Sequence, residues 1–204
     1  MDKREHIIDI AINLFAEKGF EGTSIRDLAT AAEVNVAMVN YYFGSKEKLF
    51  EAMIEHKSSY IRESLEEIST DKSKSEIEKI DAIIEIYVSR LLSEYKYHRV
   101  LHTELMLQGR MNIHEDIAAI FSRNREIMRN VIEAGIKKKV FKKVDPDLSI
   151  ASIIGTINQV LLSKPMCKLI VKEDKNFNPY TDEAFKKRLI THLKQLAHSH
   201  LLNN

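Results

Sequence analysis

The chain of 204 residues contains no tryptophan, one cysteine, six glycines and three prolines. So few turn-forming residues are untypical of an all-β sandwich and exclude a collagen-like chain. A single cysteine, Cys167, provides neither an intrachain disulfide nor a multi-cysteine zinc site, and indicates a reducing compartment. Because 31 Lys and Arg face 30 Asp and Glu, the net charge gives no hint of a nucleic-acid or membrane partner.

Long apolar runs are also missing. The longest uncharged stretch, from Leu148 to Ser163, has 16 residues and includes Ser, Thr, Asn and Gln. That is too short and too polar for a membrane span, and favours a buried helix. The charged N-terminus does not resemble a signal peptide. We therefore expect a cytoplasmic protein without membrane contact.

Apolar residues recur at helical spacing along most of the chain, which predicts an all-α fold. Gly19 is expected to end a first helix, Ser24 with Asp27 to cap a second, and Asn35 to cap a short third helix that ends near Gly44. Further helices are expected after Ser45, over 77–92, 100–107 and 113–140, after Pro146, and over 185–201. Pro165 is expected to end the uncharged helix, and only 167–171 could suggest a strand.

The three short N-terminal helices, with a tight turn between the second and third, form a helix-turn-helix pattern. Several motifs occur in order without a gap: LFAEKGF from Leu14, GTSIRDLA from Gly22, AEVN from Ala32, YYF from Tyr41 and SKEKLF from Ser45. This segment resembles the DNA-binding domain of the TetR/AcrR family of bacterial transcription regulators. The resemblance covers the first quarter of the chain, and the remainder agrees only in length and helical pattern.

The resemblance implies a helix-turn-helix domain over 1–48 and a helical effector-binding and dimerisation domain over 49–204. It also implies a homodimeric repressor that is released from a palindromic operator by a small molecule, with the last two helices as the dimer interface. Asn40 is the outward residue that can pair with adenine, whereas apolar neighbours can contact thymine methyl groups. The implied DNA-contacting residues are Thr23, Ser24, Arg26, Val36, Ala37, Met38, Asn40, Tyr41, Tyr42 and Lys46.

Two features depart from the family pattern. Glu33 stands where glycine is frequent, which predicts a slightly strained turn, and Val36 stands where a polar residue is frequent. Residues 1–50 also carry six basic against eight acidic side chains, so non-specific DNA affinity should be modest. These features motivate an alternative, namely a helical ligand-binding or adaptor protein that keeps the helix-turn-helix domain without reading DNA.

An apolar or amphipathic effector is expected in the C-terminal domain. Its predicted contacts are Tyr87, Leu105, Met106, Phe121 and Met128. His98 and His102 have the spacing of a helical metal pair, but ordinary surface or pocket histidines are favoured. No cofactor, metal or catalytic residue is predicted, because no nucleophile–base pair stands out. A dimer through the uncharged helix and the Leu189, Leu193 and Leu196 stripe is also expected.

Overall fold

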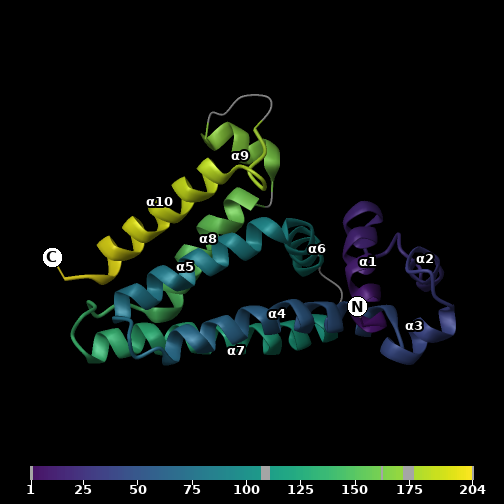
Figure 1. The fold of residues 1–204 in the computed structure, drawn as a ribbon, viewed down its shortest axis with the longest axis horizontal. Coiled ribbons are helices and arrows are strands. Elements are labelled where there is room, and N and C mark those ends of the chain that lie inside the picture. The colour runs from purple at the N-terminus through teal and green to yellow at the C-terminus, as the bar shows by residue number, and fades with distance from the viewer. Residues whose placement is uncertain (1, 107–110, 162, 172–176, 204) are drawn as a thin grey trace. The chain divides into compact units, whose positions relative to one another are not determined.

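The computed structural model describes residues 2–106, 111–161, 163–171 and 177–203, without the side chains of 111–116, 161 and 170. The described part contains ten helices and, besides one antiparallel bridge between Phe141 and Leu202, no strand. The all-α prediction is confirmed (Figure 1). The helices are α1 Lys3–Lys18, α2 Ile25–Ala31, α3 Val36–Phe43, α4 Lys46–Thr70, α5 Glu76–Ser93, α6 Tyr95–Met106, α7 Met111–Lys137, α8 Pro146–Leu161, α9 Lys164–Val171 and α10 Glu183–Leu201.

Short-range polar contacts set the helix ends. Ser24 and Asp27 form the predicted capping box, in which each side chain accepts a hydrogen bond from the other residue's backbone N–H. Asn35 accepts from the Met38 N–H at 2.7 Å and so begins α3. Gly19 ends α1 with a φ of 76°, a conformation that favours glycine.

The residues form two compact units. The first comprises residues 1–59 and 96–120, and the second comprises 60–95 and 121–204, so α4, α6 and α7 contribute to both. The predicted boundary after residue 48 separates a DNA-binding domain from an effector-binding and dimerisation domain, and it stays a prediction.

The first unit has an aromatic core at the junction of α1, the loop before α2, and α4. Phe20 folds back after Gly19, and its ring centroid lies 5.1 Å from that of Phe15 and 5.2 Å from that of Phe50. Leu28 from α2 and Val39 from α3 are fully buried. The helix-turn-helix segment is therefore anchored by its inner face, and the outer face is left for other contacts.

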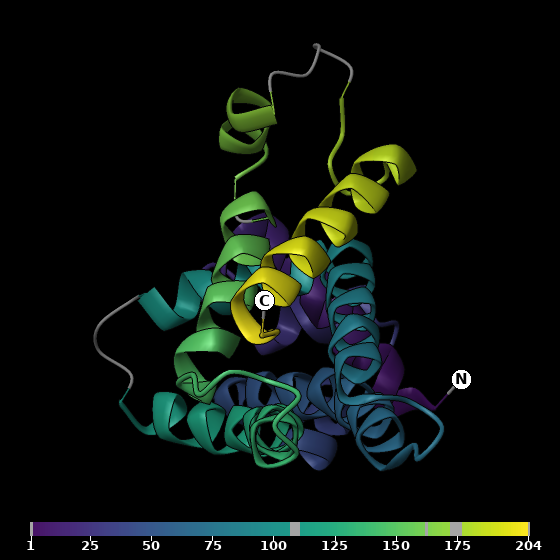
Figure 2. The same cartoon turned by 90° about the vertical axis from the view of Figure 1, so that its left-hand side faces the viewer.

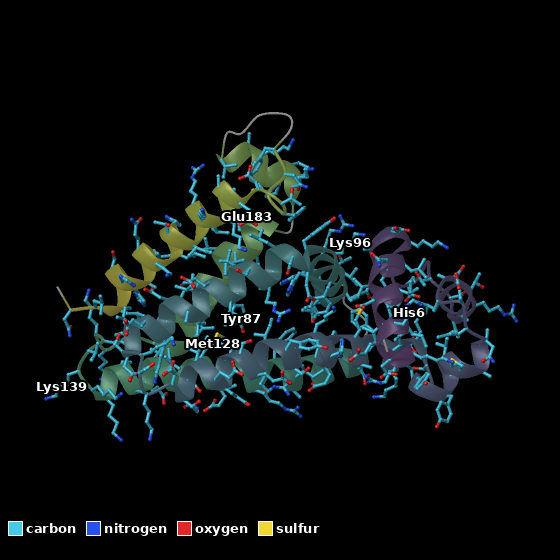
Figure 3. The ribbon with its side chains drawn as sticks, in the orientation of Figure 1. His6, Tyr87, Lys96, Met128, Lys139 and Glu183 are labelled. Atoms are coloured by element: carbon cyan, nitrogen blue, oxygen red, sulfur yellow. The ribbon has the colours of Figure 1, made fainter. Side chains whose placement is uncertain are left out.

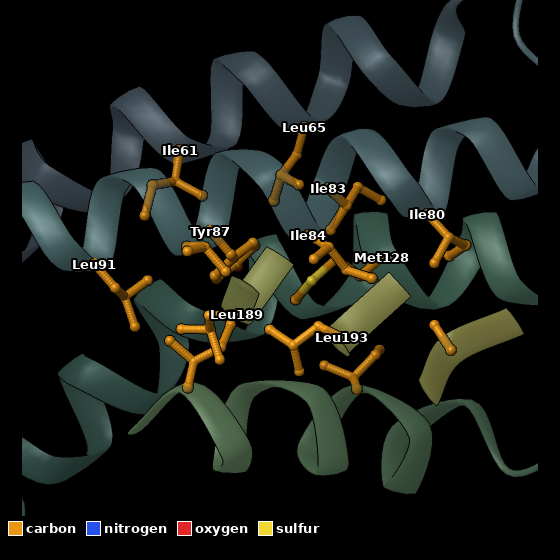
Figure 4. Packing of buried hydrophobic residues seen from close by; sticks show 14 of the residues in the cluster. Ile61, Leu65, Ile80, Ile83, Ile84, Tyr87, Leu91, Met128, Leu189 and Leu193 are labelled. Atoms are coloured by element: carbon orange, nitrogen blue, oxygen red, sulfur yellow. The ribbon is translucent and has the colours of Figure 1, made fainter. Parts of the chain in front are cut away.

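The core of the second unit is mainly aliphatic and joins α5, α8 and α10 with parts of α4 and α7. Figure 4 shows Leu189 and Leu193 of α10 in this cluster with Tyr87 and Met128. Leu193 is 0% exposed, whereas Leu196 is 41% exposed. The expectation that these leucines form one stripe for dimerisation was therefore wrong for Leu189 and Leu193, because the core of the chain itself covers them.

The segment after α8 also differs from expectation. Pro165 does not end the uncharged helix, since α8 ends at Leu161 and Pro165 is the second residue of α9. Proline is tolerated in the first turn of a helix, where its missing N–H has no intrahelical partner. The run from Cys167 to Val171 belongs to α9, and α6 begins at Tyr95, earlier than predicted.

Candidate nucleic-acid interface

The turn between α2 and α3 carries a strained residue. Glu33 has a φ of 54°, in the left-handed region that glycine adopts most easily. Its N–H donates to the Thr30 carbonyl at 3.2 Å, and the Val34 N–H donates to the Ala29 carbonyl at 3.0 Å. The turn thus closes tightly without glycine, as the sequence predicted.

Helix α3 has one buried face and one open face. Val39 and Phe43 are buried, while Val36, Ala37 and Asn40 are exposed. Met38 is half-buried. The Asn40 amide can therefore reach a partner outside the unit, and a bidentate pair with adenine is within its chemistry.

Two tyrosines mark the end of the open face. Tyr41 is 84% exposed, and Tyr42 is half-buried. Their rings meet edge to face with centroids 5.5 Å apart. The Tyr41 ring and hydroxyl are therefore open to a partner outside the unit.

The residues at the start of α2 have different surroundings. Thr23 is 1% exposed, and its hydroxyl donates to the Gly19 carbonyl at 2.8 Å, which ties it to the end of α1. Ser24 caps α2, and its hydroxyl donates to Asp27. Those hydrogen bonds from Ser24 lower the pKa of Asp27. Arg26 lies in the first turn of α2 and is exposed, so its guanidinium is the accessible cation among the residues at the start of this helix.

Lys46 is held against the first unit. Its ammonium donates to the Phe20 carbonyl at 2.9 Å, lies 3.7 Å from the Glu21 carboxylate and sits 4.4 Å from the centroid of the Phe20 ring. These contacts must loosen or be shared if Lys46 is to bind a phosphate. Lys48 pairs with Glu51 at 2.6 Å. Of the two predicted cations Arg26 and Lys46, Arg26 is the exposed one.

The predicted effector contacts are only partly brought together. Tyr87 and Met128 line a wholly apolar cavity of about 20 Å³ in the second unit. Leu105 and Met106 belong to α6 in the first unit, where Met106 is exposed, and Phe121 is half-buried outside the cavity lining. Most of the lining was not predicted from the sequence, and it consists of isoleucines from three helices: Ile80, Ile83, Ile84, Ile132, Ile150, Ile153 and Ile154.

The same unit contains a larger groove of about 560 Å³. Helices α8 and α10 approach each other where Ser149 lies 2.9 Å from the His200 ring, and they diverge towards α9 (Figure 2). The groove has an apolar floor that includes Val160, Phe185 and Leu189, and its rim carries Arg188 and His192.

Burial shifts two titratable groups. His98 of α6 is buried, and burial together with the nearby His102 lowers its pKa to about 3, so its imidazole is neutral at physiological pH. Burial also raises the pKa of Tyr87. Among the residues with described side chains, no group of three or more His, Cys, Asp or Glu is placed to hold a metal ion.

Comparisons with known proteins identify the family. Residues 7–53 match the model of bacterial regulatory proteins of the tetR family, and residues 73–162 match the tetracyclin repressor-like C-terminal domain. The chain belongs to the TetR family. Its helix-turn-helix resemblance is thereby confirmed, and the match extends into the second unit, which the motifs did not cover.

Among the curated relatives, the HTH-type transcriptional repressor NicS of Pseudomonas putida is 30% identical over 142 residues. The match spans 68% of this chain and 66% of NicS, which is just under two thirds of that protein. The fatty acid metabolism regulator protein of Bacillus subtilis is 26% identical over 160 residues, 78% of this chain and 81% of that protein.

A solved structure supports the fold over nearly the whole length. FadR of Bacillus subtilis in complex with stearoyl-CoA has a TM-score of 0.74 at 21% identity, covering 93% of this chain and 96% of that chain. No helix in the described parts is long and apolar enough to cross a membrane.

Proposed function

We propose that this TetR-family chain is a transcriptional repressor that binds an operator through α2 and α3. The observation that carries the proposal is the open face of α3, where Asn40 and Tyr41 are exposed on a helix whose other face is locked into the core. A narrow helix anchored in this way is suited to the major groove. The adaptor alternative is not favoured, because the curated relative NicS is named a transcriptional repressor.

A gel-shift with DNA from upstream of the chain's own gene tests this proposal. The wild-type protein should shift that fragment in excess unrelated DNA, and Asn40→Ala should weaken the shift. Because Asn40 is exposed, its replacement should leave thermal unfolding unchanged. A wild-type protein that binds the fragment no better than unrelated DNA would favour the adaptor alternative.

We also propose a homodimer through α8 and α10, as is typical of the family. The exposed residues of α8 fall on one face and lack charge: Leu148, Ala151, Ser152, Gly155 and Gln159. Leu196 is the exposed leucine of α10. A Cβ atom built at Gly155 meets no other atom within 4 Å, so this position is open in the single chain. Small residues would let two copies of α8 approach closely.

Gly155→Arg tests the dimer without disturbing the fold of one chain. We expect sedimentation to show a dimer for the wild type and a monomer for the variant, with helical content retained. Lys72→Met is a suitable control because Lys72 is exposed on the loop before α5. A dimeric Gly155→Arg protein would place the interface elsewhere.

We propose a long-chain acyl derivative as the effector. The support is the wholly apolar isoleucine cavity and the relation to fatty acid regulators, one of which was solved with stearoyl-CoA. A cavity of about 20 Å³ holds about one water molecule, so an acyl chain would have to push apart the helices that line it. A ligand that binds this opened state disfavours the half-site spacing of about 34–36 Å that a dimer needs.

Stearoyl-CoA and coenzyme A can be compared in the gel-shift. Stearoyl-CoA should release the DNA, and coenzyme A at the same concentration should not, since only the acyl chain suits an apolar cavity. Ile84→Phe, which fills the cavity from a fully buried position, should reduce the response. Equal release by both compounds would contradict the acyl proposal and leave the DNA-binding proposal intact.

A further inference from the structure

A dense run of positive charge lies where α7 ends. Residues 137–143, which we call the lysine turn, contain five lysines, and no acidic residue occurs from 134 to 144. Figure 3 labels Lys139 just beyond the end of α7. Cations at a helix C-terminus are favourable to its dipole, but this effect falls off within the last turn and does not account for Lys143.

Two of the five lysines are engaged inside the second unit. The Lys138 ammonium pairs with the buried carboxylate of Glu76, the first residue of α5. The Lys142 ammonium donates to the Ser199 carbonyl at 3.2 Å. These contacts attach the lysine turn to the start of α5 and to the end of α10.

The other three lysines make no ion pair in the described residues: Lys137, Lys139 and Lys143. All three are exposed. The acidic residues on either side of the turn are engaged elsewhere, since Glu133 pairs with Arg129 at 2.8 Å and the Asp145 carboxylate accepts the Leu148 N–H at 3.1 Å. Three positive charges of the turn are therefore left for a partner outside the chain.

The backbone of the lysine turn is fixed. The Lys139 N–H donates to the Ile136 carbonyl at 2.9 Å and the Val140 N–H donates to the Gly135 carbonyl at 3.0 Å, which is the Schellman pattern. Lys139 takes the left-handed position of that motif, where glycine is usual, with a φ of 61°. Phe141 anchors the turn in the core. The free lysines thus extend from one ordered backbone segment.

The lysine turn lies beside the isoleucine cavity. All three helices that line the cavity have an end here: α5 begins at Glu76, α7 ends at Lys137, and α8 begins shortly after the turn. Ile80 and Ile132 of the lining are four and five residues from the ends of α5 and α7, which is about 6–8 Å along a helix. A ligand with its apolar part in the cavity therefore has cations close to one end.

We propose that the lysine turn binds the clustered phosphates of a small ligand. An ammonium group is a compact point charge that suits phosphate oxygens, and three of them on one fixed turn can share a chain of phosphates. Two sources carry this chemistry: the nucleotide head of an acyl-CoA whose chain enters the cavity, and a free oligophosphate. The first source rests on the proposed acyl effector, and the second is independent of it.

Titration calorimetry with sodium tripolyphosphate tests the site without an acyl chain. The triple variant Lys137→Gln, Lys139→Gln and Lys143→Gln should bind tripolyphosphate about tenfold more weakly than the wild type, because each exposed ion pair contributes a factor of about two. Circular dichroism should show unchanged helical content, since the replaced side chains are exposed. Equal affinity of the two proteins for tripolyphosphate would overturn the proposal.

A matched control removes three charges elsewhere. Lys3, Lys164 and Lys187 are exposed, and their joint replacement by glutamine changes the net charge equally. This control should bind tripolyphosphate as the wild type does. If it lost the same affinity, the effect would come from net charge and the proposal would fall.

The source of the phosphates follows from comparing stearoyl-CoA with S-stearoyl-N-acetylcysteamine, a thioester that lacks phosphates. If the ligand is an acyl-CoA, the wild type should bind stearoyl-CoA about tenfold more tightly, and the lysine-turn variant should bind both alike. Equal affinities in the wild type, together with turn-dependent tripolyphosphate binding, would assign a free oligophosphate. A wild type that binds neither acyl compound would contradict the acyl effector, while the tripolyphosphate result still decides on the lysine turn.

A nucleic-acid contact is the competing use of such a surface, and unrelated duplex DNA tests it. The lysine-turn variant should bind this DNA as the wild type does, with the same slope of log affinity against log salt. A reduced slope in the variant, with unchanged binding of tripolyphosphate, would assign the turn to nucleic acid and overturn the proposal.

Discussion

The helix-turn-helix segment and the α5, α8 and α10 bundle are built on different length scales. In the first, each boundary is set by a partner within four residues, as Ser24 with Asp27 and Asn35 with Met38 show. In the second, the core joins residues more than a hundred positions apart, such as Ile84 and Leu193. Local hydrogen bonds therefore specify the helix-turn-helix segment, whereas long-range packing determines which residues of the second unit face inward.

The two leucines Leu193 and Leu196 give the largest expected contrast. Leu193→Lys places a charge in a fully buried position, and we expect the free energy of unfolding to fall by more than about 4 kcal/mol. Leu196→Lys should change it by no more than about 0.5 kcal/mol in the monomer, because the side chain is partly exposed.

Urea unfolding followed by circular dichroism measures both variants, and it should be done in the monomeric Gly155→Arg background. Two variants of equal stability would contradict the assignment of Leu193 to the core. In the wild-type background, Leu196→Lys should shift the monomer–dimer equilibrium towards monomer, as sedimentation can show.

Two helical glycines of the second unit provide the next contrast. A Cβ at Gly135 would lie 2.0 Å from the ring of Phe141, which is buried and cannot move aside freely. Gly135→Ala should therefore lower the free energy of unfolding by about 1–3 kcal/mol. In a chain made monomeric by Leu196→Lys, Gly155→Ala meets no atom and should raise it by up to about 1 kcal/mol through helix propensity. Thermal unfolding of both proteins checks the signs, and a gain at Gly135 would contradict the packing.

The sequence predicts the structure of the helix-turn-helix segment better than that of the α5, α8 and α10 bundle. The cap at Gly19, the box at Ser24 and the strained turn at Glu33 could be predicted because their partners are neighbours in the sequence. The inward direction of Leu193 could not, since a helical stripe of leucines fits a core and an interface equally well. The cavity lining and the hydrogen bond from Arg99 to the Ala16 carbonyl could not be predicted either. They depend on the three-dimensional arrangement, because no local pattern encodes contacts 83 residues apart.

Within the helix-turn-helix segment, Arg26 and Asn40 should make different contributions to DNA binding. Asn40→Ala should cost about 1–3 kcal/mol at its cognate base pair and relax preference there. Arg26→Ala should weaken all sequences alike and reduce the salt slope by about 2 in a dimer, one per subunit. Salt titrations on the upstream fragment and on single-base variants of it distinguish the two effects. Similar behaviour of both variants would show that Asn40 does not read a base.

Lys46→Ala is a less direct probe than Arg26→Ala. Its ammonium already donates to the Phe20 carbonyl, so its removal also changes a contact inside the first unit. We expect Lys46→Ala to lower both operator affinity and thermal stability, whereas Arg26→Ala should lower affinity alone. Unchanged stability in Lys46→Ala would indicate that the Phe20 contact contributes nothing to folding.

The smallest expected effect compares one strained residue from each unit. Glu33 and Lys139 have φ values of 54° and 61°, and the left-handed region costs a non-glycine residue about 1–2 kcal/mol. Glycine removes this strain but loses about 0.5–1 kcal/mol through the greater freedom of its unfolded chain. Glu33→Gly and Lys139→Gly should therefore each raise the free energy of unfolding by no more than about 1 kcal/mol. Glu33→Ala and Lys139→Ala are the controls, because alanine removes the charge and keeps the strain; glycine variants no more stable than the alanine variants would show that neither turn stores the strain its dihedral angle indicates.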